Sequence, residues 1–494
     1  SLRRQRQMCI RDRFFMLTHQ FNPYSACTSI LIGKNATADG STMIGRNEDS
    51  RAAWAKKFVV HSHTEFDQPQ TFKSTDQDHP FTMTLPKIRA KYTATPEWTP
   101  KYGLFEEDGI NEHGVAMSAT ESAYCNARVL AADPYVQDGI GEEAMVTVTL
   151  PYIKSAREGV ERLGQIVEEH GTYETNGILF SDDDEVWYME TGAGHYWVAQ
   201  RIPDDAYAVV ANQLAIQEVD YADHENFLYA KGIRDFVVDN QLASMANGLN
   251  FREVFGTADL SDLHYNTPRV WSGQQYFTPD VVQEPESFNL PFVQRANRLI
   301  HIDEAQHYLA SHYEGTPFDP VGAGSDAEKH CYRPISLAKT QESHILQIRP
   351  DRPAGTRGIH WLAMGVAAES IYVPFYSNVE TTPAAYQVAT EKYDAHSAYW
   401  IFKLAGVLVD AHYHDLHSQL NDVQKETAIA LGHHLIMTDQ ALTNVSATDL
   451  TATLTQANEQ AAKIALTAIR DLSAELITQS TDLSPLNYQT DLNL

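Results

Sequence analysis

A predicted β-hairpin between residues 27 and 49 constrains the fold more than any other segment. Residues 28–33 (TSILIG) form a short, β-branched apolar run, and residues 41–47 (STMIGRN) have the pattern of a returning strand. Between them lies a turn-rich stretch whose sharpest signal is Asp39-Gly40. The segment is therefore predicted to be two antiparallel strands.

The hairpin also predicts which side chains meet. If the turn centres near Ala38, the numbers of paired residues add up to about 76, so Cys27 faces Asp49 and Arg46 is its diagonal neighbour. A thiol, a guanidinium group and a carboxylate then gather at the open end of the hairpin. A shift of the turn by one residue would move Asp49 to the other face of the strand.

The rest of the chain predicts an α+β protein, with strands interleaved with helices and a helical end. Residues 142–170 and 223–257 have helical patterns, and the sequence favours helices from about Ala384 onward, with a break near residues 443–449. Further strands are predicted at residues 115–120, 177–180, 186–190, 195–199, 207–211, 359–365 and 370–375. The helical C-terminal region could pack on the rest of the protein or mediate homo-oligomers, and the sequence leaves both open.

Charge and cysteine content exclude several classes of partner. The formal net charge is −28, which repels nucleic acid and anionic membranes. No apolar stretch reaches the roughly 18 residues of a membrane span. The four cysteines have neither metal-ligand nor disulfide spacing, so we expect a reducing, cytoplasmic setting in which Cys125 and Cys331 are simple thiols.

No metal or other cofactor is expected. His412, His414 and His417 invite a metal site, but helical positions two apart do not face each other. The acidic turn at residues 182–185 is better explained as a solvated hairpin loop than as a calcium site.

The first 26 residues are set apart from the fold. Residues 8–13 (MCIRDR) resemble a translated sequencing-adaptor fragment, so residues 1–15 are expected to be an artefact that precedes a true start at Met16. Residues 16–26 are expected to be a short propeptide. The predicted domains are then residues 27–383, which form the catalytic part, and 384–494, the helical region.

Cys27 acquires chemical meaning if it becomes the first residue of the chain. A free α-amine titrates near pH 7.7–8.0 and can take the thiol proton at neutral pH. Asp49 would then hold the ammonium or thiol, and Arg46 would stabilise the thiolate. The alternative is a buried strand cysteine beside an Arg46–Asp49 surface ion pair, and composition alone favours this alternative.

A family resemblance favours Cys27 as a nucleophile over Cys27 as a buried strand residue. Residues 27–31 (CTSIL) and 39–49 (DGSTMIGRNED) strongly resemble the start of the lactic-bacterial dipeptidases of the dipeptidase A type, a cysteine branch of the N-terminal-nucleophile hydrolases. The likeness recurs in order over nearly the whole chain after residue 26, at residues 111–122 (NEHGVAMSATES), 185–190 (EVWYME), 210–214 (VANQL), 265–271 (YNTPRVW) and 372–376 (YVPFY).

The resemblance implies a four-layer αββα fold and hydrolysis of dipeptides of broad side-chain preference, with Cys27 exposed by autocatalytic cleavage after Ala26. Bile-salt hydrolases and penicillin V acylases share the Gly-Arg-Asn-x-Asp pattern seen at residues 45–49. The site residues that the resemblance implies are Cys27, Arg46, Asp49, Asn212 as an oxyanion donor, Arg269 as a second arginine, and Asn47 for substrate binding.

Glu121 lies where the acylases carry a different residue. Because those enzymes bind acyl groups without an α-amine, we expect Glu121 to receive the free ammonium of a dipeptide. The rival functions are an amidase or acylase of the bile-salt or penicillin type and a catalytically silent, secernin-like binding protein.

Overall fold

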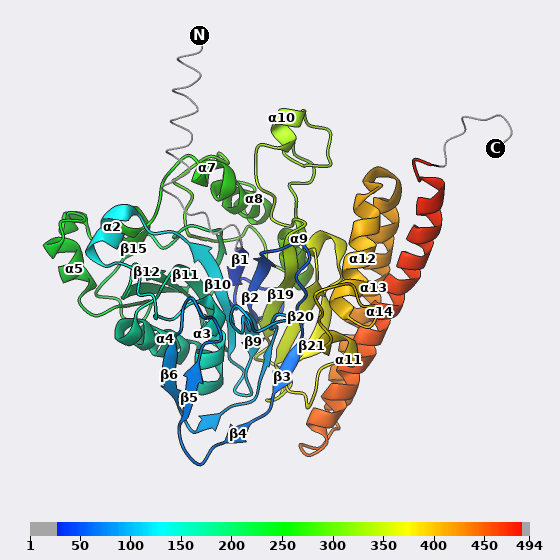
Figure 1. Ribbon diagram of the computed structural model, residues 1–494, viewed down its shortest axis with the longest axis horizontal. Coiled ribbons are helices and arrows are strands. Elements are labelled where there is room, and N and C mark those ends of the chain that lie inside the picture. Colours follow the sequence, from blue (N-terminus) through cyan, green and yellow to red (C-terminus); the bar gives the residue numbers. More distant parts are fainter. Residues whose placement is uncertain (1–26, 487–494) are drawn as a thin grey trace, which may run out of the picture.

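The computed structural model describes residues 27–486 and combines helices with sheets, in agreement with the α+β prediction (Figure 1). The expected artefact and propeptide, residues 1–26, lie outside the described residues. Among residues 27–486, no helix has both the length and the apolar character needed to cross a lipid bilayer.

Two large antiparallel sheets form the centre of the molecule. The first has the order β18-β14-β1-β2-β19-β20-β21 and the second the order β16-β13-β12-β11-β10-β9. The strands of the first are β18 (Val293–Gln294), β14 (Tyr207–Val210), β1 (Thr28–Ile32), β2 (Thr42–Asp49), β19 (Thr340–Ile348), β20 (Gly358–Met364) and β21 (Val373–Tyr376). Those of the second are β16 (Phe227–Tyr229), β13 (Tyr196–Ile202), β12 (Val186–Gly192), β11 (Thr175–Ser181), β10 (Ala116–Ala123) and β9 (Asp108–Ile110).

Four two-stranded sheets complete the β structure. They pair β15 (Glu218–Val219) with β17 (Leu249–Asn250), β3 (Val59–His61) with β8 (Tyr92–Ala94), β4 (Thr64–Glu65) with β7 (Ile88–Arg89), and β5 (Gln70–Lys73) with β6 (Thr82–Leu85).

The helices lie mainly between and after the strands. The α-helices are α2 (Ala127–Ala132), α3 (Glu142–Thr149), α4 (Ala156–His170), α5 (Ile233–Asp239), α6 (Phe251–Phe255), α7 (Asp262–Tyr265), α8 (Thr267–Phe277), α9 (Ile302–Ala310), α10 (Asp326–Lys329), α11 (Ala384–Gln387), α12 (Ala398–Asp410), α13 (Tyr413–Leu442) and α14 (Leu450–Asp482). The short 3-10 helices are η1 (Leu150–Tyr152), η2 (Met245–Asn247) and η3 (Ala367–Glu369).

The hydrophobic core is divided among the faces of the two large sheets. One buried cluster joins Leu31 and Leu346 of the first sheet to Leu179 of the second, so these sheets pack on each other. The outer face of the second sheet packs against α3 and α4, and the outer face of the first packs against α8 and α9. Because strand side chains alternate, β2 supplies Ile44 to the cluster between the sheets and Met43 to the outer cluster.

Helix α4 shows how local sequence fixes one of these covering helices. The Ser155 side chain accepts a hydrogen bond from the Glu158 amide at the helix start. Gly171 ends the helix with a φ of 72°, a conformation that glycine adopts without strain. Buried Val160 and Leu163 then face the outer side of the second sheet.

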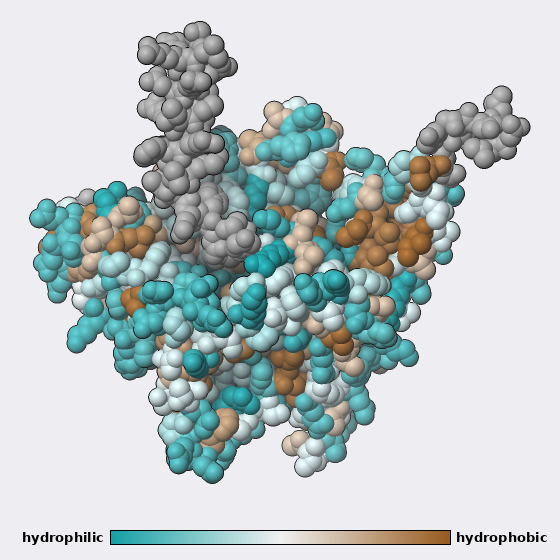
Figure 2. Space-filling model, in the orientation of Figure 1, coloured by the Kyte–Doolittle hydropathy of each residue, from teal (hydrophilic) through white to brown (hydrophobic). Residues whose placement is uncertain are grey.

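The helical C-terminal region packs on the protein itself. Helices α12, α13 and α14 share a buried cluster with Val373 and Phe375 of β21, and Figure 1 shows them side by side at one end of the molecule. Val407 and Ile477 on these helices stay exposed, and Figure 2 shows apolar side chains gathered over their upper part. Homo-oligomer formation through this surface remains a prediction.

Most of the predicted elements are present, with one clear correction. The hairpin, the meander that became β11, β12 and β13, and the helical break after residue 442 are confirmed. The prediction that residues 223–257 are largely helical is wrong, because β16 and β17 lie there beside the short helices α5 and α6. β16 extends the second sheet along β13, so tertiary pairing overrides the local helical pattern.

Candidate active site

The register of the hairpin differs from the prediction by one residue. β1 pairs with β2 so that Thr28 faces Asn47 and Ser29 faces Arg46, which places Cys27 opposite Glu48 rather than Asp49. The cause is the connecting loop, which is held by the Ala38 amide bound to the Ile300 carbonyl at 2.9 Å and is not a tight turn around Asp39-Gly40.

The Cys27 thiol is fully buried between a cation and an anion. Arg46 donates from Nη1 to Cys27 Sγ at 3.1 Å, and Cys27 Sγ donates to Glu48 Oε2 at 3.6 Å. The predicted diagonal contact between Cys27 and Arg46 is therefore present. Glu48, which the predicted register left out, takes the position expected for Asp49.

Arg46 is held rigidly by the second sheet. Its Nε donates to Ser118 Oγ at 3.0 Å, and its Nη2 donates to Glu107 Oε2 and to the Ala119 carbonyl, both at 2.8 Å. Lys56 Nζ binds the other oxygen of Glu107 at 3.1 Å. The guanidinium plane is thus fixed from several sides with one edge toward the thiol.

Behind Arg46 lies a buried chain of polar groups. His344 Nε2 lies 2.9 Å from Ser118 Oγ, and its Nδ1 lies 3.2 Å from Asp108 Oδ2. Burial lowers the pKa of His344 to about 4, so its ring is neutral at pH 7. Ser118 Oγ therefore links Arg46 to His344 and Asp108 in one buried polar chain, which fixes the oxygen that receives Arg46.

The thiol is protonated in this environment. Burial raises the pKa of Cys27 well above its ordinary value, the nearby Glu48 carboxylate raises it further, and Arg46 opposes both effects. Nucleophilic chemistry at Cys27 therefore needs a base.

A second arginine binds the backbone of the same residue. Arg269, in α8, donates from Nη1 to the Cys27 carbonyl oxygen and to Thr28 Oγ1, the latter at 2.8 Å. Its Nη2 donates to Asn212 Oδ1 at 2.7 Å, and Asn212 Nδ2 donates to the Ser122 carbonyl at 2.9 Å. The structure therefore joins Arg269 to Cys27 and Thr28, and Asn212 to Arg269, although these segments are far apart in sequence.

Asp49 and Asn47 lie on the opposite face of β2 from Arg46. Asp49 accepts hydrogen bonds from Arg333 Nη2 and Thr340 Oγ1, and burial raises its pKa while Arg333 lowers it. The Asn47 amide donates to the Leu309 carbonyl at 2.8 Å. Its Oδ1 is buried without a hydrogen-bond partner among residues 27–486, and substrate binding by Asn47 stays a prediction.

Glu121 belongs to β10 of the second sheet and contacts Ser29 of β1 in the first sheet. Its Oε2 accepts the Ser29 hydroxyl, and its buried Oε1 has no hydrogen-bond partner among residues 27–486. Burial raises the pKa of Glu121 to about 8, and Arg269 opposes this rise. A buried carboxyl group with one unused oxygen is a natural acceptor for an ammonium group.

The cluster extends beyond the predicted residues. Sequence reasoning missed Glu48, Glu107, Ser118, Arg333 and His344. Glu48 has a local signal, because it lies between Arg46 and Asp49 with the same strand parity as Arg46. The others come from distant segments and have none. A metal could be held by Cys27, Glu48 and Glu142, whose ligand atoms lie within 4.8 Å of one another, but the Arg46 cation already contacts this thiol.

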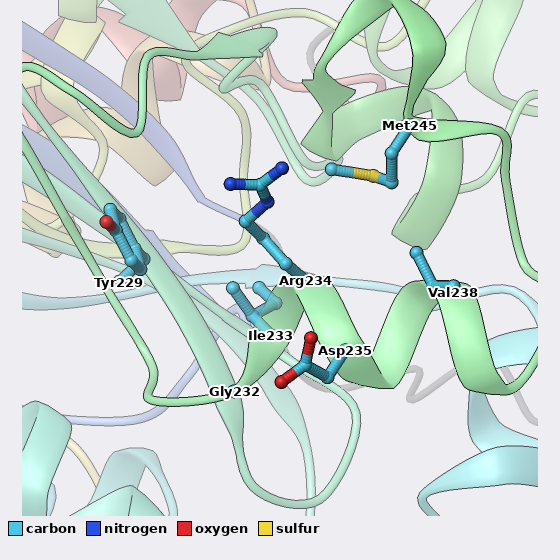
Figure 3. A pocket seen from close by; sticks show the side chains of 7 residues that line it. All are labelled: Tyr229, Gly232, Ile233, Arg234, Asp235, Val238 and Met245. Carbon is cyan, nitrogen blue, oxygen red and sulfur yellow. The ribbon is translucent and has the colours of Figure 1, made fainter.

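A surface hollow of about 330 Å³ beside α5 is separate from this cluster (Figure 3). The sticks in Figure 3 show Arg234 and Met245 turned toward the hollow and Tyr229 at its edge. None of the residues that line it belongs to the cluster around Cys27.

Comparison with known proteins gives the family. Residues 26–426 match Peptidase family C69. The chain is 44% identical over 476 residues to "Probable dipeptidase" of Latilactobacillus sakei, which covers 95% of this chain and 98% of that protein. It is 39% identical to "Dipeptidase A" of Lactobacillus helveticus, with 94% and 98% covered, and 39% identical to "Dipeptidase" of Bifidobacterium longum, with 86% and 84% covered.

A strand-initial thiol held by a buried arginine fits a cysteine-type peptidase. The chain belongs to Peptidase family C69.

Proposed function

We propose that this peptidase is a cysteine dipeptidase of broad side-chain preference, with Cys27 as an N-terminal nucleophile exposed by autocatalytic cleavage after Ala26. The observation that carries the proposal is the Cys27 thiol at the start of β1, 3.1 Å from Arg46 Nη1. The names of the relatives support the dipeptidase activity. The two facing sheets with helices on their outer faces support the N-terminal-nucleophile αββα fold.

Processing begins with the peptide bond before Cys27. The thiol gives its proton to Glu48, 3.6 Å away, and the sulfur attacks the Ala26 carbonyl carbon. The C–N bond breaks as the nitrogen takes a proton, which leaves Ala26 on sulfur as a thioester. Water hydrolyses the thioester and frees both the thiol and the α-amine of Cys27.

Turnover uses that amine as the base. The amine takes the thiol proton, and the thiolate attacks the dipeptide carbonyl beside Arg46. Asn212 Nδ2 stabilises the resulting oxyanion, an interaction that is typically worth about 2.7–4 kcal/mol. The Cys27 ammonium gives its proton to the leaving amine, and water then hydrolyses the acyl-enzyme thioester.

The other residues position these groups. Arg269 holds the Cys27 carbonyl and the Asn212 side chain in one arrangement. Asp49 is proposed to hold the released ammonium, because it lies on the Thr28 face of the hairpin. Glu121 is proposed to bind the substrate ammonium.

Mass spectrometry and a substrate panel test the proposal together. Purified active protein should begin at Cys27 by intact mass, and Cys27→Ala should abolish both processing and dipeptide hydrolysis. Cys27→Ser is the matched variant, because its hydroxyl can still process slowly. Active protein that retains Ala26 would contradict the proposal.

The panel also separates the rival functions. Free dipeptides should be hydrolysed, whereas faster hydrolysis of glycocholate or penicillin V would favour an acylase. A thiol-reactive probe that fails to label Cys27 in processed protein would favour a silent binding protein. A cytoplasmic location, the absence of nucleic-acid and membrane partners, and dipeptides as the substrates belong to the same proposal.

A further inference from the structure

A second cluster of reactive side chains lies apart from the Cys27 thiol. It consists of His264 at the end of α7, Glu286 in the segment after α8, and Cys331 in the segment after α10. One ligand atom from each lies within 4.8 Å of the other two. We propose that these three residues form a binding site for a divalent transition metal, with zinc as the expected ion.

The ligand chemistry selects the class of metal. A thiolate, an imidazole and a carboxylate are the three ligand types that zinc prefers, whereas calcium and magnesium take oxygen ligands alone. Three protein ligands leave the fourth tetrahedral position for water.

The geometry is close to what a tetrahedral ion requires. Zinc–ligand bonds of about 2.0–2.3 Å place neighbouring ligand atoms about 3.5 Å apart. His264 Nδ1 and Glu286 Oε1 already lie 3.6 Å apart. Their side chains are 50% and 43% exposed, so small rotations can bring them to Cys331 without disturbing the core.

A second layer of contacts holds the carboxylate and the imidazole. Tyr332 donates its hydroxyl to Glu286 Oε1 at 2.9 Å, and its ring stacks with that of His264. Such outer partners orient metal ligands and raise affinity. Because Tyr332 follows Cys331 in the chain, one short segment supplies both a ligand and its support.

The cluster is connected to the segments that carry Arg269 and Arg333. The Arg333 amide donates to the His264 carbonyl at 3.2 Å, and the Arg333 side chain pairs with Asp49. The Arg269 and Arg333 guanidinium groups both lie over the ring of Tyr265, the residue after His264, at 5.1 and 5.3 Å. A bound ion would therefore brace the two segments that carry the active-site arginines.

Cobalt is the first probe, because a thiolate bound to Co²⁺ gives a charge-transfer band in the near ultraviolet. The test uses the full-length Cys27→Ala protein, so that the Cys27 thiol and its amine cannot chelate the ion. We expect one Co²⁺ per chain, the charge-transfer band, and its displacement by Zn²⁺. The inference stands apart from the proposed function, because this protein is inactive by design and the readout is metal binding.

Two substitutions in that protein locate the site. Cys331→Ser should abolish the band and weaken zinc binding at least about 100-fold, since loss of an outer partner alone costs about 10- to 100-fold. Cys125→Ser is the matched control, because it removes a different free thiol outside this cluster, and it should change neither. A band that persists in Cys331→Ser, or the lack of a stoichiometric ion in the Cys27→Ala protein, would overturn the proposal.

Thermal unfolding gives an independent readout. An ion that binds only the folded chain raises its melting temperature. Zn²⁺ should therefore raise the Tm of the Cys27→Ala protein. It should raise the Tm of the same protein carrying His264→Gln little or not at all. Equal rises in the two proteins would place the ion elsewhere and refute the site.

Discussion

Glu121→Gln tests how this peptidase would recognise a free dipeptide. In the structure, Glu121 accepts the Ser29 hydroxyl on one oxygen and has no partner among residues 27–486 on the other. The substitution keeps the shape of the side chain and removes its ability to ionise. If the unused oxygen binds the substrate ammonium, kcat/KM should fall only for substrates with a free α-amine.

The size of the effect follows from burial. Truncating one partner of a buried, hydrogen-bonded charge pair costs about 2–5 kcal/mol. At about 1.4 kcal/mol per factor of ten, kcat/KM for a free dipeptide should fall roughly 30-fold to several thousand-fold. Because the Gln carbonyl oxygen still accepts a hydrogen bond from the ammonium, we expect a loss near the lower end, about 100-fold.

The pH dependence gives a second signature. Burial raises the pKa of Glu121 to about 8, so the free enzyme carries a neutral carboxyl group at pH 7 and must lose that proton when an ammonium binds. KM for free dipeptides should therefore fall as pH rises from 6 toward 8. It should rise again when the dipeptide amine itself loses its charge, near pH 7.7–8.0 and above.

The assay compares each free dipeptide with its N-acetyl form. Glu121→Gln should lose activity on the free dipeptide, lose the fall of KM between pH 6 and 8, and change activity on the N-acetyl form less than about threefold. Glu190→Gln is the matched control, because Glu190 is also buried with a pKa raised to about 8 but binds the backbone amides of Ala215 and Ile216. An equal loss on both substrates in Glu121→Gln would refute the ammonium role.

Unfolding checks that the carboxyl group titrates as described. The folded-state pKa of Glu121 lies above the unfolded value near 4.5, so its contribution to stability is complete below pH 4.5 and is lost as pH rises toward 8. Gln has no such loss. The Tm of Glu121→Gln relative to wild type should therefore rise between pH 5 and 8, and a constant difference would contradict the raised pKa.

Three further substitutions probe the thiol, the oxyanion and the fold. Glu48→Gln removes a carboxylate that raises the pKa of Cys27. In protein expressed without residues 1–26, which needs no self-cleavage, the pH midpoint for alkylation of Cys27 by iodoacetamide should fall by about one unit or more, and an unchanged midpoint would exclude an effect of Glu48 on the thiol. Asn212→Ala should lower kcat for dipeptides about 100- to 1000-fold with little change in KM, and a change confined to KM would exclude an oxyanion donor. Gly109→Ala places a Cβ 1.8 Å from a carbonyl oxygen of the neighbouring strand and should cost about 3 kcal/mol or more of stability by thermal unfolding, whereas Gly432→Ala on open helix surface should be harmless.

The sequence predicted the secondary-structure elements better than it predicted which elements contact each other. The hairpin, the meander and the late helices have local signals, namely β-branched runs, turn residues and helical spacing. Residues 223–257 have a helical pattern too, yet Phe227–Tyr229 becomes an edge strand because β13 offers a free row of backbone groups. No feature of the local sequence indicates that β13 has an edge available for pairing.

The candidate site divides in the same way. Cys27, Arg46 and Glu48 share one hairpin, so their contact follows from strand parity once the register is known. Ser118 contacts Arg46, and His344 contacts Ser118, because the two sheets pack face to face. The sequence spacing of these residues does not indicate this packing. Family resemblance supplied Asn212 and Arg269, which physical reasoning on one sequence could not have placed.

A shift of one residue in the register changes the chemistry more than the fold. With Asp49 opposite Cys27, one carboxylate would have to hold both the thiol and the future ammonium. The observed register places two carboxylates on opposite faces of β2, with Glu48 beside the thiol and Asp49 beside Arg333. In the proposed processing, Glu48 is the base for cleavage before Cys27, while Asp49 stays paired with Arg333 on the face where the new ammonium would need a partner.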